Sequence, residues 1–325
     1  MSAPAVRELV RVEGLCKNFQ VGSGFLGATR QVLQAVDDLN LSVLTGEVLG
    51  LVGESGCGKS TLGRLILRLM EPTAGRVFFQ GQEISHLGRA QMRGLRRQMQ
   101  IVFQDPVTSL NPRLTVGGIL AEPLRIHRMG NQQQIQARVE ELLAEVGLRP
   151  EHARRYPHQF SGGQRQRIGI ARALALHPRL VVADEPVSAL DVSIQAQVIN
   201  LLMDLKERFG LTYLLVAHDL SVVSHLSDRI AVMYLGKIME VTPAALFNRP
   251  PRHPYTEALL LAAPLADPGR RMPPPALKGD VASPINPPAG CRFHTRCPEA
   301  QALCQDQVPE LREIEPGHLC ACHFR

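Results

Sequence analysis

The sequence predicts an α/β fold built around a largely parallel sheet. Two continuous apolar runs of the kind found in buried strands, residues 180–183 and 211–217, flank an amphipathic helical stretch at 193–209. A third apolar run, 48–52, leads through a glycine-rich loop into a helical run at 61–69. Such alternation of strands and helices is typical of α/β proteins, whose parallel sheets bind ligands at the carboxyl ends of their strands.

The N-terminal elements follow from apolar spacing. Short strands are expected at residues 8–12, 76–79 and 99–103, with a further apolar segment at 32–43 and a glycine-rich loop at 21–29.

Helices should account for most of residues 106–175 and for the stretch at 193–209. Apolar residues at helical spacing mark two of them: Val139, Leu142, Leu143 and Val146 in the first, and Val198, Leu201, Leu205 and Phe209 in the second. Gly147 and Gly210 are placed to end these helices.

Composition limits the possible classes of protein. The chain has 325 residues, which is long enough for about two domains. Its net charge of +6 fits an anionic ligand such as a nucleotide but does not argue for nucleic acid. No apolar run reaches the ~20 residues that span a bilayer, and the N-terminus lacks a secretory core. We therefore expect a cytosolic chain that reaches a membrane only through a partner.

A phosphate-binding loop is the most informative segment. It consists of Gly53, Glu54, Ser55, Gly56, Cys57, Gly58, Lys59, Ser60 and Thr61. A glycine, four residues and Gly-Lys-Ser, placed between a strand and a helix, let backbone N–H groups surround phosphate oxygens at a helix N-terminus. Lys59 then reaches the terminal phosphates, and the Ser60 hydroxyl ligates magnesium. The alternative, an incidental glycine-rich turn, does not explain the flanking strand and helix.

Besides phosphate binding, ATP hydrolysis requires an ordered metal ion and a positioned water molecule. Four polar residues at strand ends are candidates for these two tasks. Asp184 is expected to hold magnesium, and Glu185 to polarise the attacking water as general base. Gln104 is placed to contact the magnesium or the water, and His218 to hydrogen-bond the γ-phosphate. Each residue alone could be an ordinary solvated strand end, but a phosphate loop in the same chain favours the functional interpretation.

A second anion-binding turn lies more than a hundred residues further along, in the segment FSGGQRQR. Its nest consists of Ser161, Gly162, Gly163 and Gln164 at the start of a helical run. One nucleotide needs only one such cradle, so the second turn must serve something else.

These motifs, in this order, resemble the nucleotide-binding subunits of ABC transporters, and the chain is similar to oligopeptide and dipeptide importer ATPases, especially the dipeptide type. The resemblance implies a P-loop NTPase (RecA-like) core with a helical subdomain. It assigns residues 53–61 to the Walker A motif, Gln104 to the Q-loop and residues 160–164 to the LSGGQ-type signature. It also assigns Asp184 and Glu185 to the Walker B pair and residues 188–191 to the D-loop. His218 corresponds to the switch histidine, and Phe19 to the aromatic residue that stacks on adenine.

The resemblance also implies partners. In this family two ATPase subunits pair head to tail, and the turn at residues 161–164 of one covers the γ-phosphate held by Lys59 of the other. We therefore expect a second, different ATPase chain, two transmembrane permease subunits and, indirectly, an extracytoplasmic peptide-binding protein. The expected activity is ATP-driven uptake of dipeptides or oligopeptides, from the cytoplasmic face of the inner (plasma) membrane.

Proline becomes dense after residue 250, which argues against a regular core there. We expect residues 1–250 to form the ABC nucleotide-binding domain, with a helical subdomain at about 105–175. Residues 251–325 are expected to form an extended appendage tied by cysteines.

Five of the seven cysteines crowd the last 35 residues, a pattern that in a reducing cytosol indicates metal binding before disulfides. The segments RHPYTEALL and SPINPPAGC resemble the C-terminal extension of peptide-importer ATPases, whose four cysteines map onto Cys291, Cys297, Cys304 and Cys322. Some members hold a [4Fe–4S] cluster there. Zinc also binds four thiolates, but intervals of five, six and seventeen residues depart from zinc-finger spacing. Free thiols are the third alternative, and Cys320 is an extra thiol that competes with Cys322 as fourth ligand.

Cys57 lies inside the phosphate loop, near a helix N-terminus. This placement predicts a lowered thiol pKa and reaction with alkylating reagents, although a small filler residue is the simpler interpretation.

Other functions stay open at this point. The substrate could instead be a nickel complex, haem or glutathione, since relatives carry them. A soluble ABC ATPase acting on DNA or ribosomes usually fuses two ATPase units or inserts long coiled coils, and this chain has neither. A redox- or iron-sensing regulator would depend mainly on the cysteine tail.

Overall fold

The computed structural model describes residues 7–21, 31–247, 252–262 and 282–325. The chain divides into two compact units. The helix-rich unit comprises Met1–Arg7, Leu44–Glu47 and Leu87–Val216. The phosphate-loop unit comprises Glu8–Val43, Val48–His86 and Ala217–Arg325.

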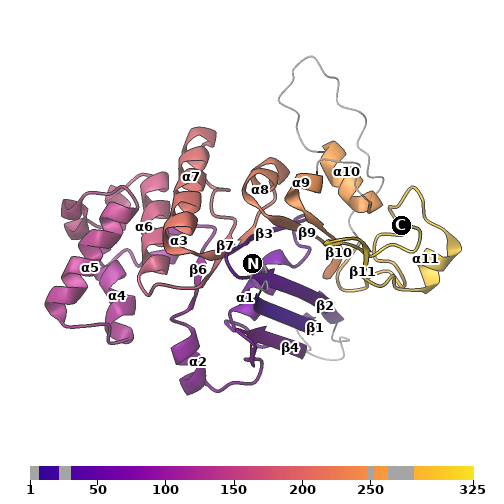
Figure 1. The fold of residues 1–325 in the computed structure, drawn as a ribbon, viewed down its shortest axis with the longest axis horizontal. Coiled ribbons are helices and arrows are strands. Elements are labelled where there is room, and N and C mark those ends of the chain that lie inside the picture. The colour runs from indigo at the N-terminus through magenta and orange to yellow at the C-terminus, as the bar shows by residue number, and fades with distance from the viewer. Residues whose placement is uncertain (1–6, 22–30, 248–251, 263–281) are drawn as a thin grey trace, which may run out of the picture. The chain divides into compact units, whose positions relative to one another are not determined.

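Helices dominate the helix-rich unit. They are α2 (Arg89–Leu95), α3 (Pro106–Ser109), α4 (Val116–Ile126), α5 (Gln132–Glu145), α6 (Gly162–Leu174) and α7 (Val192–Phe209), with short 3₁₀ turns η1 (Pro150–Arg154) and η2 (Pro157–Gln159). Figure 1 shows α4, α5 and α6 packed together. The first turn of α5 is fixed by a reciprocal cap between Asn131 and Gln134.

Three parallel strands belong to this unit. They are β6 (Met99–Val102), β7 (Leu180–Asp184) and β8 (Thr212–Val216), with β7 between the other two. All five residues of β7 and of β8 are buried. In the register Asp184 lies opposite Val216, so the chain leaves both strands at the same edge.

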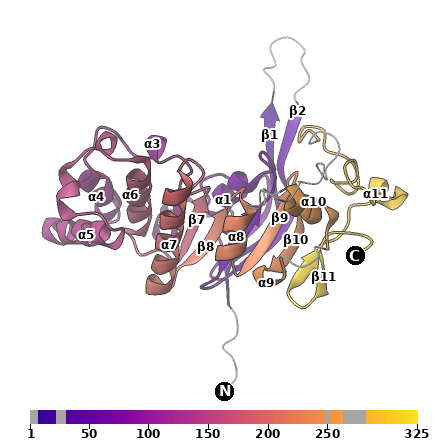
Figure 2. The same ribbon diagram turned by 90° about the horizontal axis from the view of Figure 1, so that it is seen from above.

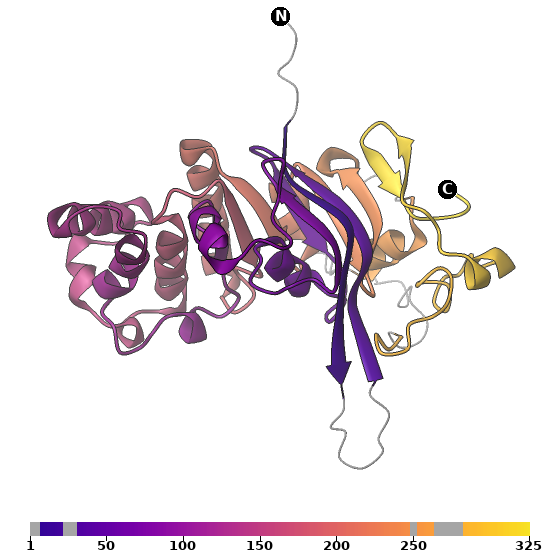
Figure 3. The ribbon, with the colours of Figure 1, turned by 90° about the horizontal axis from the view of Figure 1, so that it is seen from below.

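The described strands of the phosphate-loop unit belong to two sheets. One, with order β2-β1-β4-β5, consists of β1 (Glu8–Val21), β2 (Gln31–Leu44), β4 (Ala74–Phe79) and β5 (Gln82–Glu83). The other contains, in order, β11 (Arg312–Glu315), β12 (His318–Cys320), β10 (Lys237–Pro243), β9 (Arg229–Tyr234) and β3 (Val48–Val52). Figure 3 shows the long strands β1 and β2 in indigo, side by side.

Among the described residues of this unit, five helices accompany these strands. They are α1 (Lys59–Ile66), α8 (Leu220–Leu226), α9 (Ala244–Phe247), α10 (Pro254–Ala262) and α11 (Ala302–Asp306). In Figures 1 and 2, α8 lies near α9, and α8 contacts both α9 and β3.

Most predicted elements are confirmed, with shifted boundaries. The helix after the phosphate loop begins at Lys59 and ends at Ile66, earlier than predicted at both ends. Gly147 and Gly210 follow α5 and α7 with φ of 72° and 61°, the left-handed conformation that ends a helix. On α7 the predicted face is wrong at one position, because Leu202 is buried instead of Leu201.

A largely parallel sheet is only part of the architecture. β3 pairs with β9, and β6 with β7 and β8, in parallel. The pairs β1–β4, β4–β5, β9–β10, β10–β12 and β11–β12 are antiparallel. The strands predicted at residues 8–12 and 76–79 therefore belong to a separate antiparallel sheet, as parts of β1 and β4, whereas the strand predicted at 99–103 is β6, which pairs in parallel with β7.

The expectation of an appendage without a regular core is wrong. Tyr255 on α10, Phe293 and Cys320 on β12 are each fully buried, and β12 extends the sheet by pairing with β10. Several of the prolines that suggested an extended chain lie at residues 264–275, outside the described residues. The division at residue 250 stays a prediction, and the phosphate-loop unit contains residues on both sides of it.

No helix in the described part of the chain has both the length and the apolar character needed to cross a membrane.

Candidate nucleotide site

The phosphate loop runs from the end of β3 into α1 and packs tightly against its own unit. At Gly58, φ is 110°, and a Cβ would lie 2.1 Å from the Ala35 carbonyl oxygen on β2. At Gly53 a Cβ would lie 2.1 Å from the Met233 carbonyl oxygen on β9. Only glycine fits these two positions, so two strands fix the path of the loop.

Lys59 lies in the first turn of α1 with 5% of its surface exposed. Its ammonium donates to the carbonyl oxygens of Gly53 at 2.8 Å and Glu54 at 3.0 Å. The backbone of the loop therefore holds the Lys59 ammonium above the loop, and in this position its charge can neutralise phosphate oxygens. Ser60 is the next residue of the same helix turn.

The predicted lowered pKa of Cys57 is wrong. The side chain is buried, with 4% exposed, and points toward Lys59, whose ammonium lies 3.8 Å from the sulfur. Burial raises the pKa of the Cys57 thiol above its ordinary value, and the charge of Lys59 offsets only part of that rise. The interpretation as a small filler residue is the one that fits this environment.

Gln104, Asp184 and Glu185 lie in the helix-rich unit. Gln104 follows β6, and its Nε2 donates to Oε2 of Glu185 at 2.7 Å. Asp184 is the buried last residue of β7, and Glu185 follows it with a φ of 46°. The Glu185 N–H donates to the Val216 carbonyl oxygen at 2.9 Å. This unit therefore brings together the predicted Q-loop glutamine and the predicted general base.

The second anion-binding turn caps α6. Ser161 Oγ accepts from the Gln164 N–H at 3.3 Å, and Gln164 Oε1 accepts from the Ser161 N–H at 3.1 Å. Ser161 and Gly162 are exposed, so the first turn of α6 presents N–H groups to solvent, and the Ser161 hydroxyl keeps a hydrogen to donate. Gly163 is buried against α7, where a Cβ would lie 2.4 Å from Cγ2 of Ile194.

His218 and Phe19 belong to the phosphate-loop unit, as the phosphate loop does. His218 is exposed two residues after β8 and precedes Asp219, which caps α8. Phe19 is half-buried on β1, with the Lys17 ammonium 5.2 Å from the centre of its ring. The catalytic positions are thus divided between the two units.

Four of the C-terminal cysteines share one small cavity of about 20 Å³, which Phe293 and Pro254 also line; they are Cys291, Cys297, Cys304 and Cys322. Burial, followed by the charges of the other three thiols, raises the pKa of Cys291 to about 11. Cys320 does not line the cavity, because it lies fully buried on β12. In the described part of the chain, no set of three or more His, Cys, Asp or Glu is arranged to hold a single metal ion.

Known proteins match the chain over its whole length. A model of the ABC transporter family matches residues 36–188, and one of the oligopeptide/dipeptide transporter C-terminal region matches residues 239–304. The chain is 52% identical to the oligopeptide transport ATP-binding protein AppF of Bacillus subtilis, with 100% of this chain and 99% of that protein aligned. The chain belongs to the ABC transporter ATP-binding proteins.

Two further comparisons agree with this assignment. The probable peptide ABC transporter ATP-binding protein y4tS of Sinorhizobium fredii is 51% identical over 98% of this chain and 90% of its own length. The dimeric post-hydrolysis structure of the ATP-binding cassette MJ0796, bound to ADP and Pi, has a TM-score of 0.65 and 31% identity, covering 72% of this chain and 98% of that one. The P-loop NTPase fold and the ATPase class, with ATP and Mg²⁺ as its ligands, are confirmed.

One set of contacts at the phosphate loop has no signal in the sequence. Arg296, from the cysteine-containing segment, donates to the Glu54 carboxylate, and the Tyr255 hydroxyl accepts from the Glu54 N–H. Neither residue lies near the loop in the sequence, and neither belongs to a motif of phosphate-binding loops.

Proposed function

We propose that this chain hydrolyses ATP at the cytoplasmic face of a membrane and so drives uptake of short peptides through separate permease subunits. The observation that carries the proposal is the match of residues 239–304 to the oligopeptide/dipeptide transporter C-terminal region, in a chain whose N-terminal part matches the ABC transporter model. The names of the relatives, oligopeptide and peptide transport ATP-binding proteins, point to the same substrate class.

The roles of the site residues follow from the chemistry of phosphoryl transfer. Lys59 and the loop amides bind the phosphates, while Ser60, Asp184 and Gln104 hold magnesium. Glu185 polarises the attacking water, and its hydrogen bond to Gln104 orients it for this task. His218 bonds the γ-phosphate, and Phe19 stacks on the adenine.

The chain acts in a head-to-tail pair with a second ATPase subunit, which is a different chain. The exposed first turn of α6, capped by Ser161 and Gln164, supports this arrangement because its N–H groups can donate hydrogen bonds to a γ-phosphate held by a neighbour. Relatives of known structure are described as dimeric.

Isolation of the complex from membranes through this chain tests the proposal. We expect a second ATPase subunit and two permease chains to co-purify, and ATP hydrolysis by the complex to respond to the peptide-loaded binding protein. Stimulation by a nickel complex, haem or glutathione instead would change the substrate class. Recovery of this chain alone, or with ribosomes or DNA, would contradict a role in transport.

We also propose that Cys291, Cys297, Cys304 and Cys322 hold a [4Fe–4S] cluster. The four thiols share one cavity, where burial and the neighbouring cysteines disfavour the thiolate form of Cys291, and a cationic group among the four would offset both effects. In such a cluster each thiolate binds its own iron, so the four sulfurs do not need to converge on one point as they do around zinc.

Iron, sulfide and zinc assays of anaerobically purified protein test this proposal, together with its visible absorption. We expect about four irons and four sulfides per chain, lost when Cys297 and Cys304 are both replaced by serine and retained in Cys320→Ser. Stoichiometric zinc, or no metal in protein purified without oxygen, would contradict the cluster.

A further inference from the structure

Glu54, the second residue of the phosphate loop, is held by two side chains from the C-terminal region. The Arg296 guanidinium donates to both carboxylate oxygens of Glu54, with Nη1–Oε2 at 2.8 Å and Nη2–Oε1 at 3.1 Å. The Glu54 N–H donates to the Tyr255 hydroxyl at 3.0 Å. A bidentate arginine–carboxylate pair fixes orientation as well as charge.

The pair is well shielded from solvent. The Arg296 side chain is 6% exposed and that of Glu54 is 21% exposed. The hydrogen bonds with Glu54 raise the pKa of Arg296 above its already high range, so the guanidinium is charged at every pH at which the protein is folded. The Tyr234 hydroxyl accepts a further bond from Arg296 at 3.4 Å.

Aromatic packing holds Arg296 in place. Phe293, three residues earlier, packs against Tyr234 and Tyr255, with ring centres 5.5 and 5.2 Å apart. Arg292 also ties this segment to β2, donating to the Asp37 carboxylate at 2.6 Å. The segment between Cys291 and Cys297 is thus fastened to the phosphate-loop unit at several points, and Arg296 cannot easily turn away from Glu54.

The contact has consequences for nucleotide binding. Glu54 places a carboxylate in a loop that must bind a polyphosphate, and an unpaired carboxylate there would repel the ligand. The Glu54 carbonyl oxygen also accepts from the Lys59 ammonium at 3.0 Å, so the position of Glu54 bears on that of Lys59. We propose that Arg296 is a positioning residue for the ATPase reaction, which favours ATP binding by neutralising Glu54 and fixing the loop beneath Lys59.

The KM for ATP and the dissociation constant of a fluorescent ATP analogue test this inference in the full-length chain. Arg296→Gln should raise both about tenfold, the size expected for one uncompensated charge near the phosphates, and should change kcat by less than about threefold. Adding Glu54→Gln should return both constants to within about threefold of the wild-type values, because the repelling charge is then absent.

Arg252→Gln is the matched control. Arg252 also belongs to the C-terminal region and pairs with a glutamate, but that glutamate is Glu315 on β11. Its KM should equal that of the wild type. An unchanged KM in Arg296→Gln, or a double variant as defective as the single one, would overturn the inference.

The test does not depend on the folding of the single variant. If Arg296→Gln does not accumulate as folded protein, Glu54→Gln is compared with Glu54→Gln/Arg296→Gln. Without the carboxylate, the loss of Arg296 should alter KM by less than about twofold. A several-fold rise in that comparison would overturn the inference, because Arg296 would then act on the nucleotide by another route.

Discussion

At the residue scale, Glu185 shows how the backbone supports a catalytic side chain. Its φ of 46° lies in the left-handed region that non-glycine residues rarely adopt. Its own N–H, its carbonyl oxygen and its carboxylate bond to Val216, Ser188 and Gln104, respectively. These contacts hold the residue in a conformation that the sequence alone would not predict.

Replacement of Glu185 by glutamine should lower ATP hydrolysis about 100-fold or more and leave ATP binding intact. Glutamine keeps the shape and an oxygen that can accept from Gln104, but it cannot act as a general base. Steady-state hydrolysis and equilibrium binding of a labelled nucleotide measure the two effects. Glu207→Gln, an exposed change on α7, is the control, and a Glu185→Gln protein that turns over at the wild-type rate would contradict the assignment.

Cys57 should react slowly with alkylating reagents near pH 7. The thiol is buried and its pKa is raised, so the reactive thiolate becomes abundant only at a pH above the usual pKa of a thiol. The rate of alkylation should therefore still be rising between about pH 8 and pH 9. Mass spectrometry of iodoacetamide-treated native protein over this range measures the rate, with urea-unfolded protein as reference. Rapid modification of native Cys57 at pH 7, blocked by ATP, would contradict the raised pKa and support the lowered pKa that the sequence predicts.

At the element scale, the sequence predicts the helices that are marked by apolar spacing and by a glycine after the last turn. α5 and α7 have apolar residues at helical spacing and a glycine in the left-handed region after each end, so both are predicted correctly. No strand is predicted in the region of β9 and β10, whose hairpin turns at Leu235 and Gly236, both with positive φ. Leucine is a poor turn residue, so the sequence gives little indication of a hairpin here.

The phosphate loop should tolerate a methyl group at one glycine much better than at another. Gly58→Ala should abolish ATP binding, because the new Cβ would lie 2.1 Å from a backbone oxygen of β2. Gly56→Ala meets nothing within 4 Å and bears only the strain of a φ of 78°, roughly 1 kcal/mol. Nucleotide binding and thermal unfolding of both variants measure the difference. Equal losses would show that the close contact with β2 does not matter.

At the scale of the whole molecule, the least predictable contacts join distant parts of the chain. Glu54 and Arg296 are 242 positions apart, and Glu240 and His318 are 78 apart. Nothing local marks such partners, and the proline-rich composition after residue 250 suggests the opposite of the buried structure found there. The nucleotide motifs, in contrast, are readable because each is a short, continuous segment with its own chemistry.

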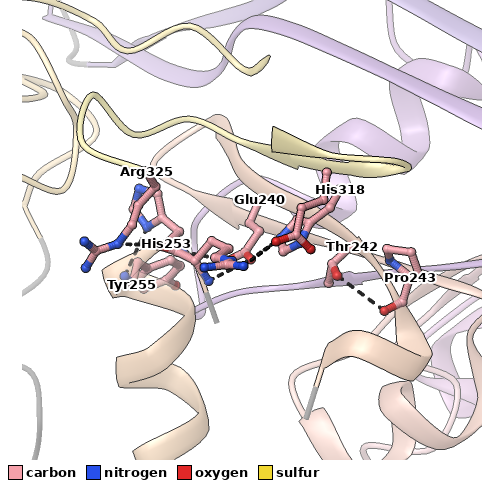
Figure 4. Close-up of polar contacts among 9 residues, drawn as sticks. Glu240, Thr242, Pro243, His253, Tyr255, His318 and Arg325 are labelled. Carbon is pink, nitrogen blue, oxygen red and sulfur yellow. Dashed lines mark hydrogen bonds and ion pairs between the residues drawn. The ribbon is translucent and has the colours of Figure 1, made fainter. Parts of the chain in front are cut away.

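Figure 4 shows the buried carboxylate that joins the C-terminal strands to β10. Glu240 is 1% exposed and accepts from the backbone N–H groups of Arg252 and His253 at 3.2 and 3.1 Å. Nε2 of His318, on β12, lies 2.7 Å from the same carboxylate. A buried carboxylate that loses a partner is costly, so this contact stabilises the docking of β12.

His318→Leu should therefore lower the free energy of unfolding by about 3 kcal/mol and speed hydrogen exchange in β11 and β12. Urea unfolding and hydrogen exchange followed by mass spectrometry measure these effects. His225→Leu, at an exposed position of α8, should change neither quantity appreciably. Unaltered exchange in β12 of His318→Leu would show that Glu240 does not anchor this strand.

ATP-dependent peptide uptake is the most direct test of the account. The complex isolated through this chain is reconstituted into proteoliposomes, and accumulation of a labelled short peptide is followed with its binding protein present. Uptake should require ATP and should fall at least about 100-fold when the complex carries Glu185→Gln. Uptake that continues at the wild-type rate with this variant, or a complex that hydrolyses ATP without moving any peptide, would contradict the assignment of this chain as the motor of a peptide importer.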